Sequence, residues 1–456
     1  MGVTEASKIE LNWKPKIENM LQIVNRWKKR EISLYGRIIL CKTFLLSQIN
    51  YVIQSLSLPE QVLNEIDSIF FKFIWQKRGS NKRVFEKIKR KVLCLDVKQG
   101  GLKMISVKDQ QKVYNIKWIS RVVKDQVSPT AYFANHFFEN VGGIHYISKS
   151  SLLHPQFFFD KVVKNWFWKN AACSWSSLHN NLKGDPSSVQ SILSQPIFLN
   201  SNIQYKKSSL IFPRWIKNNI LFICDIVEQG SLKSRNDLVG SVGNYALLIF
   251  EHNALINALP AEWVTDISSI SNEEIIYARA NRGEFSATEQ LILDMKNCEM
   301  RNYIVNSIQV TKHNENLWKR KLGVDIAKYY DIATNATQES RLRLLHFKIL
   351  HNIYPTNILL SKMKVKPSDL CETCQVPDYI EHFFFECSSI HNFWNHVNNF
   401  IRTKVNIDLH LNKNNILMGI ACSEFPSLKR KVVDFINSII LIGKLCISKF
   451  RYGKIN

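Results

Sequence analysis

The sequence predicts a mainly α-helical protein, a helical array of several domains. Its 456 residues correspond to two to four domains at roughly 100–200 residues per domain. Apolar residues make up 45% of the chain, enough to build large buried cores and to exclude wholesale disorder. Only 16 glycines and 12 prolines interrupt it, which argues against collagen-like and turn-dense all-β architectures.

Helical periodicity is strong in the first 125 residues. Met20, Val24 and Trp27 recur at a spacing of three or four and predict a helix that ends in a basic cluster. Pro59 is suited to the first turn of a helix, and an apolar face then continues over residues 62–75.

Turn residues and periodic segments organise the rest of the chain. Residues 184–188 and 240–243 are rich in Gly and Ser and predict surface connections between short helices. Residues 342–350 carry one apolar face, and residues 390–401 carry another, on which we expect Trp394, Phe400 and Ile401. Both segments predict helices near the C-terminus.

The charge of the chain is strongly positive and unevenly distributed. The formal net charge is +23, from 61 Lys and Arg against 38 Asp and Glu. Residues 1–125 hold 25 basic and 11 acidic side chains, residues 126–335 hold 20 and 18, and residues 336–456 hold 16 and 9. Two basic ends around a nearly neutral middle are typical of separate surfaces that contact a polyanion, most commonly RNA or DNA.

Several classes of protein are disfavoured. The first residues lack the positive and apolar regions of a secretory signal, and the longest apolar run, residues 439–442, is far shorter than the ~18 residues of a membrane span. Ten cysteines without a signal predict reduced thiols. We therefore expect an intracellular protein, in the nucleus, the cytoplasm or both, with no membrane partner.

A Cys-Cys-His-Cys pattern predicts a metal site. Cys371 and Cys374 form a Cys-x-x-Cys pair, His382 follows after seven residues, and Cys387 after four more. Zinc prefers four such ligands in a tetrahedron, and a Cys-x-x-Cys turn supplies two of them. Because all four come from the protein, we expect a closed, structural Zn²⁺ site without a position for a catalytic water.

Two alternatives to this ligand set stay open. The cysteines are also compatible with ordinary core residues beside a surface histidine. His391 or His396 is also close enough along the chain to replace His382 as the fourth ligand.

These ligands, together with the flanking residues 341–352 and Phe393-Trp394, resemble the zinc-binding domain at the C-terminus of non-LTR (LINE-type) retrotransposon reverse transcriptases. The N-terminal third is similar to the segment that follows the polymerase palm in those polyproteins, at Trp27, residues 33–38, Lys42, Tyr51, residues 73–75 and residues 100–102. The middle of the chain also resembles the family, with matching blocks in the same order at residues 196–200, Trp215, residues 225–226 and residues 259–263. The chain departs from the family at Asp96-Val97, where many relatives have Pro-Lys.

The resemblance implies a division into four parts. These are a basic helical, thumb-like segment (1–125), a mixed, mainly helical connecting domain (126–335), a reverse-transcriptase-type zinc-binding domain (336–400) and a C-terminal helical tail (401–456). It also implies that the partners are the template RNA and the target DNA of target-primed reverse transcription, together with the palm-containing part of the same polyprotein.

We expect no catalysis from this chain. The family's palm carries an Asp-Asp turn that holds metal ions, and this sequence contains no Asp-Asp pair. By resemblance, the palm would precede Met1. The nuclease of some site-specific relatives needs Pro-Asp followed by an acid-x-Lys triplet, whereas Pro377-Asp378 is followed by Glu381-His382-Phe383.

The candidate nucleic-acid-binding residues are basic. The run over residues 77–91 faces a single acid, Glu86, and we expect it to contact phosphates. The full set is Lys28, Lys29, Arg30, Lys77, Arg78, Lys82, Arg83, Lys87, Lys89, Arg90, Lys91, Arg341, Arg343 and Lys348. Solvated basic faces are the alternative for each group. Residues 166–168, Trp-Phe-Trp, are candidates for base stacking, with core packing as the favoured alternative for two of them.

Two functions follow from these observations. The first is a nucleic-acid-binding part of a retrotransposon reverse transcriptase that lacks the polymerase active site. The second is a zinc-stabilised structural or protein-interaction remnant of a retroelement, including a decayed gene, with no independent activity. The basic N-terminal third favours the first, and the nearly neutral middle fits the second.

Neutralising Lys82, Arg83, Lys89 and Arg90 together should weaken binding of RNA and DNA alike, because phosphate contacts carry no sequence information. The slope of log affinity against log salt should flatten by up to ~0.7–0.9 for each phosphate that is no longer bound. Binding titrations at several salt concentrations measure both. An unchanged affinity and slope would place the phosphate-binding surface elsewhere.

Overall fold

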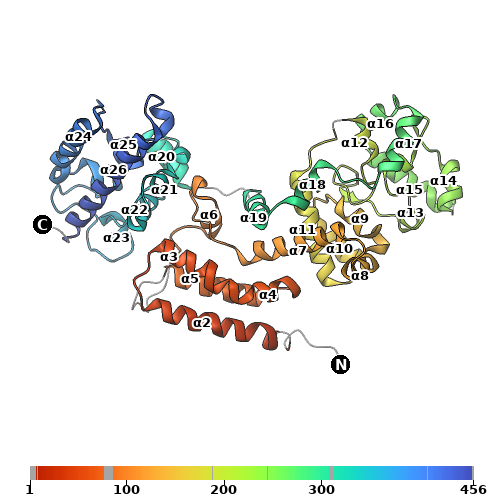
Figure 1. Cartoon of the computed structure of the whole chain (residues 1–456), viewed down its shortest axis with the longest axis horizontal. Coiled ribbons are helices and arrows are strands. Elements are labelled where there is room, and N and C mark those ends of the chain that lie inside the picture. The colour runs from red at the N-terminus through yellow and green to blue at the C-terminus, as the bar shows by residue number, and fades with distance from the viewer. Residues whose placement is uncertain are drawn as a thin grey trace. The chain divides into compact units, whose positions relative to one another are not determined.

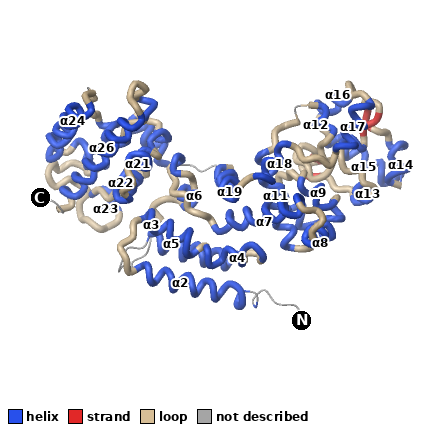
Figure 2. The backbone as a smooth tube through the Cα atoms, in the orientation of Figure 1, coloured by secondary structure: helices blue, strands red, loops and turns tan. Residues whose placement is uncertain are grey.

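The structure is a computed structural model that describes residues 7, 9–75, 86–186, 188–243, 245–307, 313–407 and 409–453. It is mainly α-helical, which confirms the predicted fold class (Figure 1). The strands within the described residues form two short antiparallel hairpins, β1 (Gln204–Tyr205) with β2 (Ser208–Ser209) and β3 (Val227–Glu228) with β4 (Ser231–Leu232). Helices and loops therefore make up nearly all of the described backbone (Figure 2).

The chain divides into two compact units. The first comprises Met1–Ile49, Gln61–Ser106 and Ile308–Asn456, and the second comprises Asn50–Glu60 and Val107–Ser307. This grouping differs from the four segments expected from the sequence, because residues 61–106 join the unit that contains the Cys-Cys-His-Cys pattern.

The helices of the first unit come from both ends of the chain. They are α2 (Lys14–Lys28), α3 (Leu34–Leu40), α5 (Glu60–Trp75), α6 (Arg90–Cys94), α20 (His313–Leu322), α21 (Ile332–Ala336), α22 (Ser340–Leu350), α23 (Asn357–Lys362), α24 (His391–Val405), α25 (Lys413–Met418) and α26 (Arg430–Arg451). α4 (Ser47–Ser55) contains residues of both units, and the first residue of α5 belongs to the second.

The second unit contains the middle of the chain. Its helices are α7 (Val107–Lys124), α8 (Pro129–Phe138), α9 (Gly143–Ser148), α10 (Pro155–Val162), α11 (Trp166–Leu182), α12 (Val189–Leu193), α13 (Pro213–Lys217), α14 (Arg235–Val242), α15 (Tyr245–Ala258), α16 (Ala261–Ile267), α17 (Asn272–Asn281), α18 (Ala287–Asp294) and α19 (Asn297–Asn306).

The apolar faces predicted from periodicity are largely buried in the first unit. The predicted helix over residues 62–75 is α5, which buries Ile66 and Phe70. Helix α26 packs against α21, α22 and α24. The apolar face of α24 is narrower than predicted, since Trp394 and Ile401 are buried but Phe400 is 47% exposed.

A close backbone approach explains the Gly100-Gly101 pair. Gly100 has a φ of +80°, and a Cβ atom there would lie 2.7 Å from the ring of Tyr330. The Gly100 carbonyl accepts a hydrogen bond from Nε2 of His351 at 2.8 Å. A Cβ on Gly101 would lie 2.0 Å from the carbonyl oxygen of Leu95. Side chains are therefore excluded where the N-terminal segment meets the helices around the Cys-Cys-His-Cys pattern.

The aromatic triplet of α11 lies mainly in the core of the second unit. Trp168 is buried, and Phe167 packs edge-on against Trp118 with ring centroids 5.6 Å apart. Trp166 is 37% exposed. Trp175, two turns further along the same helix, donates a hydrogen bond from its indole nitrogen to the Ser148 carbonyl at 2.8 Å.

One predicted connection is a loop and the other is helical. Residues 184–186 form a loop, and Ser187 lies outside the described residues. Residues 240–242 instead belong to α14, so that prediction was wrong. A capping box between Ser234 and Asp237 starts this helix, and its reciprocal hydrogen bonds outweigh the low helix propensity of Gly240. Within the described residues, every helix is too short or too polar to cross a bilayer.

Gly100→Ala should lower the free energy of unfolding of the first unit by about 1–3 kcal/mol, because alanine is strained at this φ and its Cβ overlaps Tyr330. Urea unfolding followed by near-ultraviolet circular dichroism measures the change. Gly184→Ala is the matched control, since a Cβ there meets no described atom within 4 Å. Equal stability of the two variants would contradict the role assigned to Gly100.

Candidate metal centre

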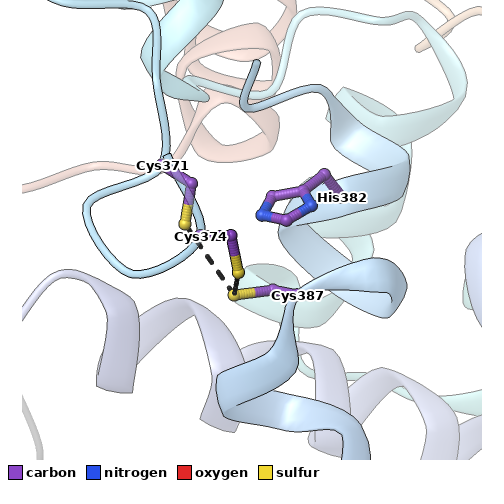
Figure 3. A group of neighbouring side chains, drawn as sticks. All are labelled: Cys371, Cys374, His382 and Cys387. Carbon is purple, nitrogen blue, oxygen red and sulfur yellow. Dashed lines mark hydrogen bonds between the residues drawn. The ribbon is translucent and has the colours of Figure 1, made fainter. Parts of the chain in front are cut away.

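Four side chains predicted as metal ligands meet at one point of the first unit. The ligand atoms of Cys371, Cys374, His382 and Cys387 all lie within 4.8 Å of one another (Figure 3). The Cys387 sulfur is 3.8 Å from that of Cys371 and 3.6 Å from that of Cys374. The arrangement could hold a metal ion among the four groups.

The first two ligands lie on a tight turn. The Cys371 amide donates to the carbonyl of Val376 at 2.8 Å, and the Gln375 amide donates to the carbonyl of Cys371 at 2.9 Å. An antiparallel bridge between Leu370 and Pro377 closes the base of the turn. Gln375 adopts a left-handed φ of +54°, which reverses the chain directly after Cys374.

The other two ligands flank a single helical turn. His382 begins a π-helical turn, His382–Glu386, and the Cys387 amide donates back to the His382 carbonyl at 3.1 Å. Phe384 is fully buried beneath this turn, and its carbonyl accepts a hydrogen bond from the Trp394 indole at 2.7 Å. Aromatic packing thus fixes the second pair of ligands, as the Phe-rich sequence between them suggests.

The His382 imidazole is suited to bind a metal. Its Nε2 atom is buried and has no hydrogen-bond partner among the described residues, and the ring is turned edge-on toward the sulfurs (Figure 3). Burial, with a smaller effect from Arg451, lowers the pKa of His382 and so favours the neutral ring that metals require. His391 and His396 are exposed on α24 and lie outside the four-residue group.

The site has polar neighbours that the sequence pattern did not identify. Nη2 of Arg451, the last residue of α26, lies 3.1 Å from the Cys371 sulfur and 3.1 Å from Oδ1 of the buried Asp378. The hydroxyls of Ser388 and Ser389 lie 3.2 Å and 3.1 Å from the sulfurs of Cys374 and Cys387. Serine hydrogen bonding lowers the pKa of the Cys374 thiol, whereas burial raises that of Cys387.

The candidate nucleic-acid-binding residues are spread over the first unit. Lys77, Arg78, Lys82 and Arg83 lie outside the described residues. Exposed members are Lys28, Lys29, Arg30, Lys87, Lys89, Arg90, Lys91 and Arg341, and Lys348 is half-buried. The guanidinium of Arg30 lies over the ring of Trp27, 4.8 Å from its centroid.

Two of these arginines are engaged within the protein. Arg343 donates hydrogen bonds to the carbonyls of Thr337 and Thr334 at 2.7 and 3.1 Å, at the end of α21. Arg90 pairs with Glu86 at 3.3 Å and Asp67 at 3.5 Å. Their charges are thus partly used to hold the fold together.

Comparison with known proteins gives one distant likeness. Over 112 residues, a quarter of the chain, the sequence is 24% identical to a "Putative ribonuclease H protein" of Arabidopsis thaliana. The chain covers 18% of the length of that protein. No protein-family model matches the chain.

Cys374→Ser should abolish binding of one metal ion per chain and loosen residues 365–400, while residues 9–75 stay folded. Removing one ligand of four costs much of the binding free energy, to which local folding is coupled. Metal analysis and hydrogen exchange measure the two effects. Cys422→Ser, an exposed cysteine outside the group, is the control and should retain both. Metal bound equally by both variants would exclude Cys374 as a ligand.

Proposed function

We propose that the four-residue group binds Zn²⁺. A tetrahedral zinc with arms of ~2.3 Å separates its thiolate sulfurs by about 3.8 Å. The sulfurs of Cys371 and Cys374 lie at 3.8 and 3.6 Å from that of Cys387, which fits this geometry. Three thiolates and one imidazole are also a donor set that favours zinc over the harder Mg²⁺ and Ca²⁺.

The proposed role of the ion is structural. With four protein ligands, the metal has no open coordination position for a substrate or a water. It would join the Cys-x-x-Cys turn to the π-helical turn that begins at His382 and so fix the loop between α23 and α24.

We further propose that the chain is the nucleic-acid-binding part of a non-LTR retrotransposon reverse transcriptase. The likeness to a protein named for ribonuclease H supports a connection with nucleic acid. The ordered sequence blocks described above support the more specific family. The observation that carries the proposal is the closed Cys-Cys-His-Cys group within a chain of net charge +23.

In this proposal the chain assists a polymerase and performs no chemistry of its own. The exposed cluster Lys28–Arg30 at the end of α2 would contact the phosphates of RNA or DNA, as would Lys89 and Lys91 at the start of α6. The palm-containing part of the same polyprotein would supply the catalytic carboxylates. Added to such a fragment, the chain would increase processive synthesis by holding template and duplex.

The zinc-loaded protein should bind RNA with an affinity that falls steeply as salt rises, because bound phosphates release counterions. Replacing the three residues of Lys28–Arg30 by glutamine should flatten the single-strand salt slope by up to ~2.1, at ~0.7 per phosphate. The matched control is the same change at Lys429–Lys431, another exposed basic triplet. Fluorescence anisotropy at several salt concentrations measures both.

An affinity for RNA that does not change with salt would contradict phosphate binding and favour the protein-interaction alternative. Primer extension or nicking by the pure chain, abolished when one of its own carboxylates is replaced, would contradict the non-catalytic role.

A further inference from the structure

A large half-open groove lies in the second unit, away from every residue discussed as a binding site above. Its volume is about 1080 Å³. Its walls are the first half of α7, the start and outer face of α10, one face of α11 and the β1–β2 hairpin. α7 and α10 both pack on α11 (Figure 1). The groove therefore has a helical floor.

Four lysines line this groove, and we refer to it as the lysine groove. They are Lys108 and Lys112 of α7, Lys161 of α10 and Lys207 of the hairpin. None of the residues that line it is acidic. The carboxylate of Asp109, which is not part of the lining, is 4.0 Å from the Lys112 ammonium. Positive charge is therefore concentrated here. Lys108 and Lys112 belong to the basic segment 1–125, and Lys161 and Lys207 belong to the nearly neutral segment 126–335.

The lining also offers an exposed phenylalanine ring and uncharged polar side chains. Phe157 lines the groove and is 63% exposed, so its ring is accessible from the groove. The Lys161 ammonium lies 3.9 Å from the centroid of this ring. Asn115, Asn170 and Ser174 of the two long helices line the floor, where the Asn115 amide donates a hydrogen bond to the Ser174 hydroxyl at 3.3 Å.

We propose that the lysine groove binds a short single-stranded segment of RNA or DNA. Lysines along a groove that also presents an exposed aromatic ring are the combination that single-strand sites use, with phosphates at the ammonium groups and a base against the ring. The volume is at the upper end of the ~300–1,000 Å³ of small-molecule sites, which suits a few unpaired nucleotides. A duplex keeps its bases stacked inside and presents no free base face to Phe157.

This inference rests on the proposed nucleic-acid function but assigns a second site, in the unit that lacks the metal group. It differs from the surface of Lys28–Arg30 in two respects. It requires an unpaired strand, and it depends on an aromatic contact as well as on charge.

The charge contribution is tested in the full chain with the variant Lys108→Gln, Lys112→Gln, Lys161→Gln, Lys207→Gln. Its affinity for a short fluorescein-labelled oligouridylate should fall about tenfold or more near 0.1 M salt, and the salt slope should flatten by up to ~2.8, at ~0.7 per phosphate. The control changes Lys124, Lys164, Lys217 and Lys296 to glutamine, an equal loss of charge from the same unit outside the groove. It should stay within about twofold of the parent protein.

The aromatic contribution is tested with Phe157→Ala. The affinity for the single strand should fall by about 5- to 100-fold, the range expected for removal of one base stack, while binding to a duplex of the same length should not change. Phe133→Ala is the matched control, since Phe133 is also 63% exposed but lies on α8, outside the groove.

The outcomes separate this inference from the proposed function. Protein that binds no RNA at low salt would overturn both. If the parent protein binds RNA and both the groove variant and the control variant bind it as tightly, only the proposal about the lysine groove is overturned. If polyglutamate displaces the labelled RNA as effectively as unlabelled oligouridylate does, the groove is a site for acidic peptides. That result would also overturn the proposal about the lysine groove.

Discussion

Electrostatic repulsion among three cysteines constrains the whole metal-bearing region. Their sulfurs lie with an imidazole inside 4.8 Å, and as thiolates they would place three like charges at contact distance. A cation bound among the three sulfurs would offset this repulsion. The Arg451 guanidinium, 3.1 Å from the Cys371 sulfur, supplies one positive charge at its edge. Because Arg451 ends α26, the longest helix of the described chain, the electrostatics of the site are tied to the helix that packs on α21, α22 and α24.

The sequence predicted contacts between residues that lie close together along the chain. Cys371, Cys374, His382 and Cys387 lie within one short segment, so their spacing alone indicated that they meet, and the geometry of the four side chains agrees with it. Arg451 could not be found in this way, because only the packing of α26 brings it to Cys371. The fold class followed from periodicity, but the grouping of residues 61–106 with the C-terminal region depends on contacts that no local pattern encodes.

Net charge counted along the sequence was a poor guide to where positive charge is available. In the basic ends, Arg343 and Arg90 direct part of their charge to carbonyls and carboxylates of the fold. In the second unit, Lys108 and Lys112 from the basic N-terminal segment and Lys161 and Lys207 from the nearly neutral middle line one groove without a lining carboxylate. Surface potential depends on which side chains share a face, and a segment total averages over all faces.

The path of the chain through the first unit has a consequence for its synthesis. The contact of Gly100 with Tyr330 and His351 joins residues separated by the main segment of the second unit, Val107–Ser307. At roughly 5–20 residues per second, translation of the intervening ~200 residues takes about 10–40 s. For that interval, Gly100 lacks Tyr330 and His351, its contacts in the C-terminal part of the first unit. The second unit is nearly continuous in sequence, so it can complete its core on the ribosome first, and the metal-bearing unit closes last.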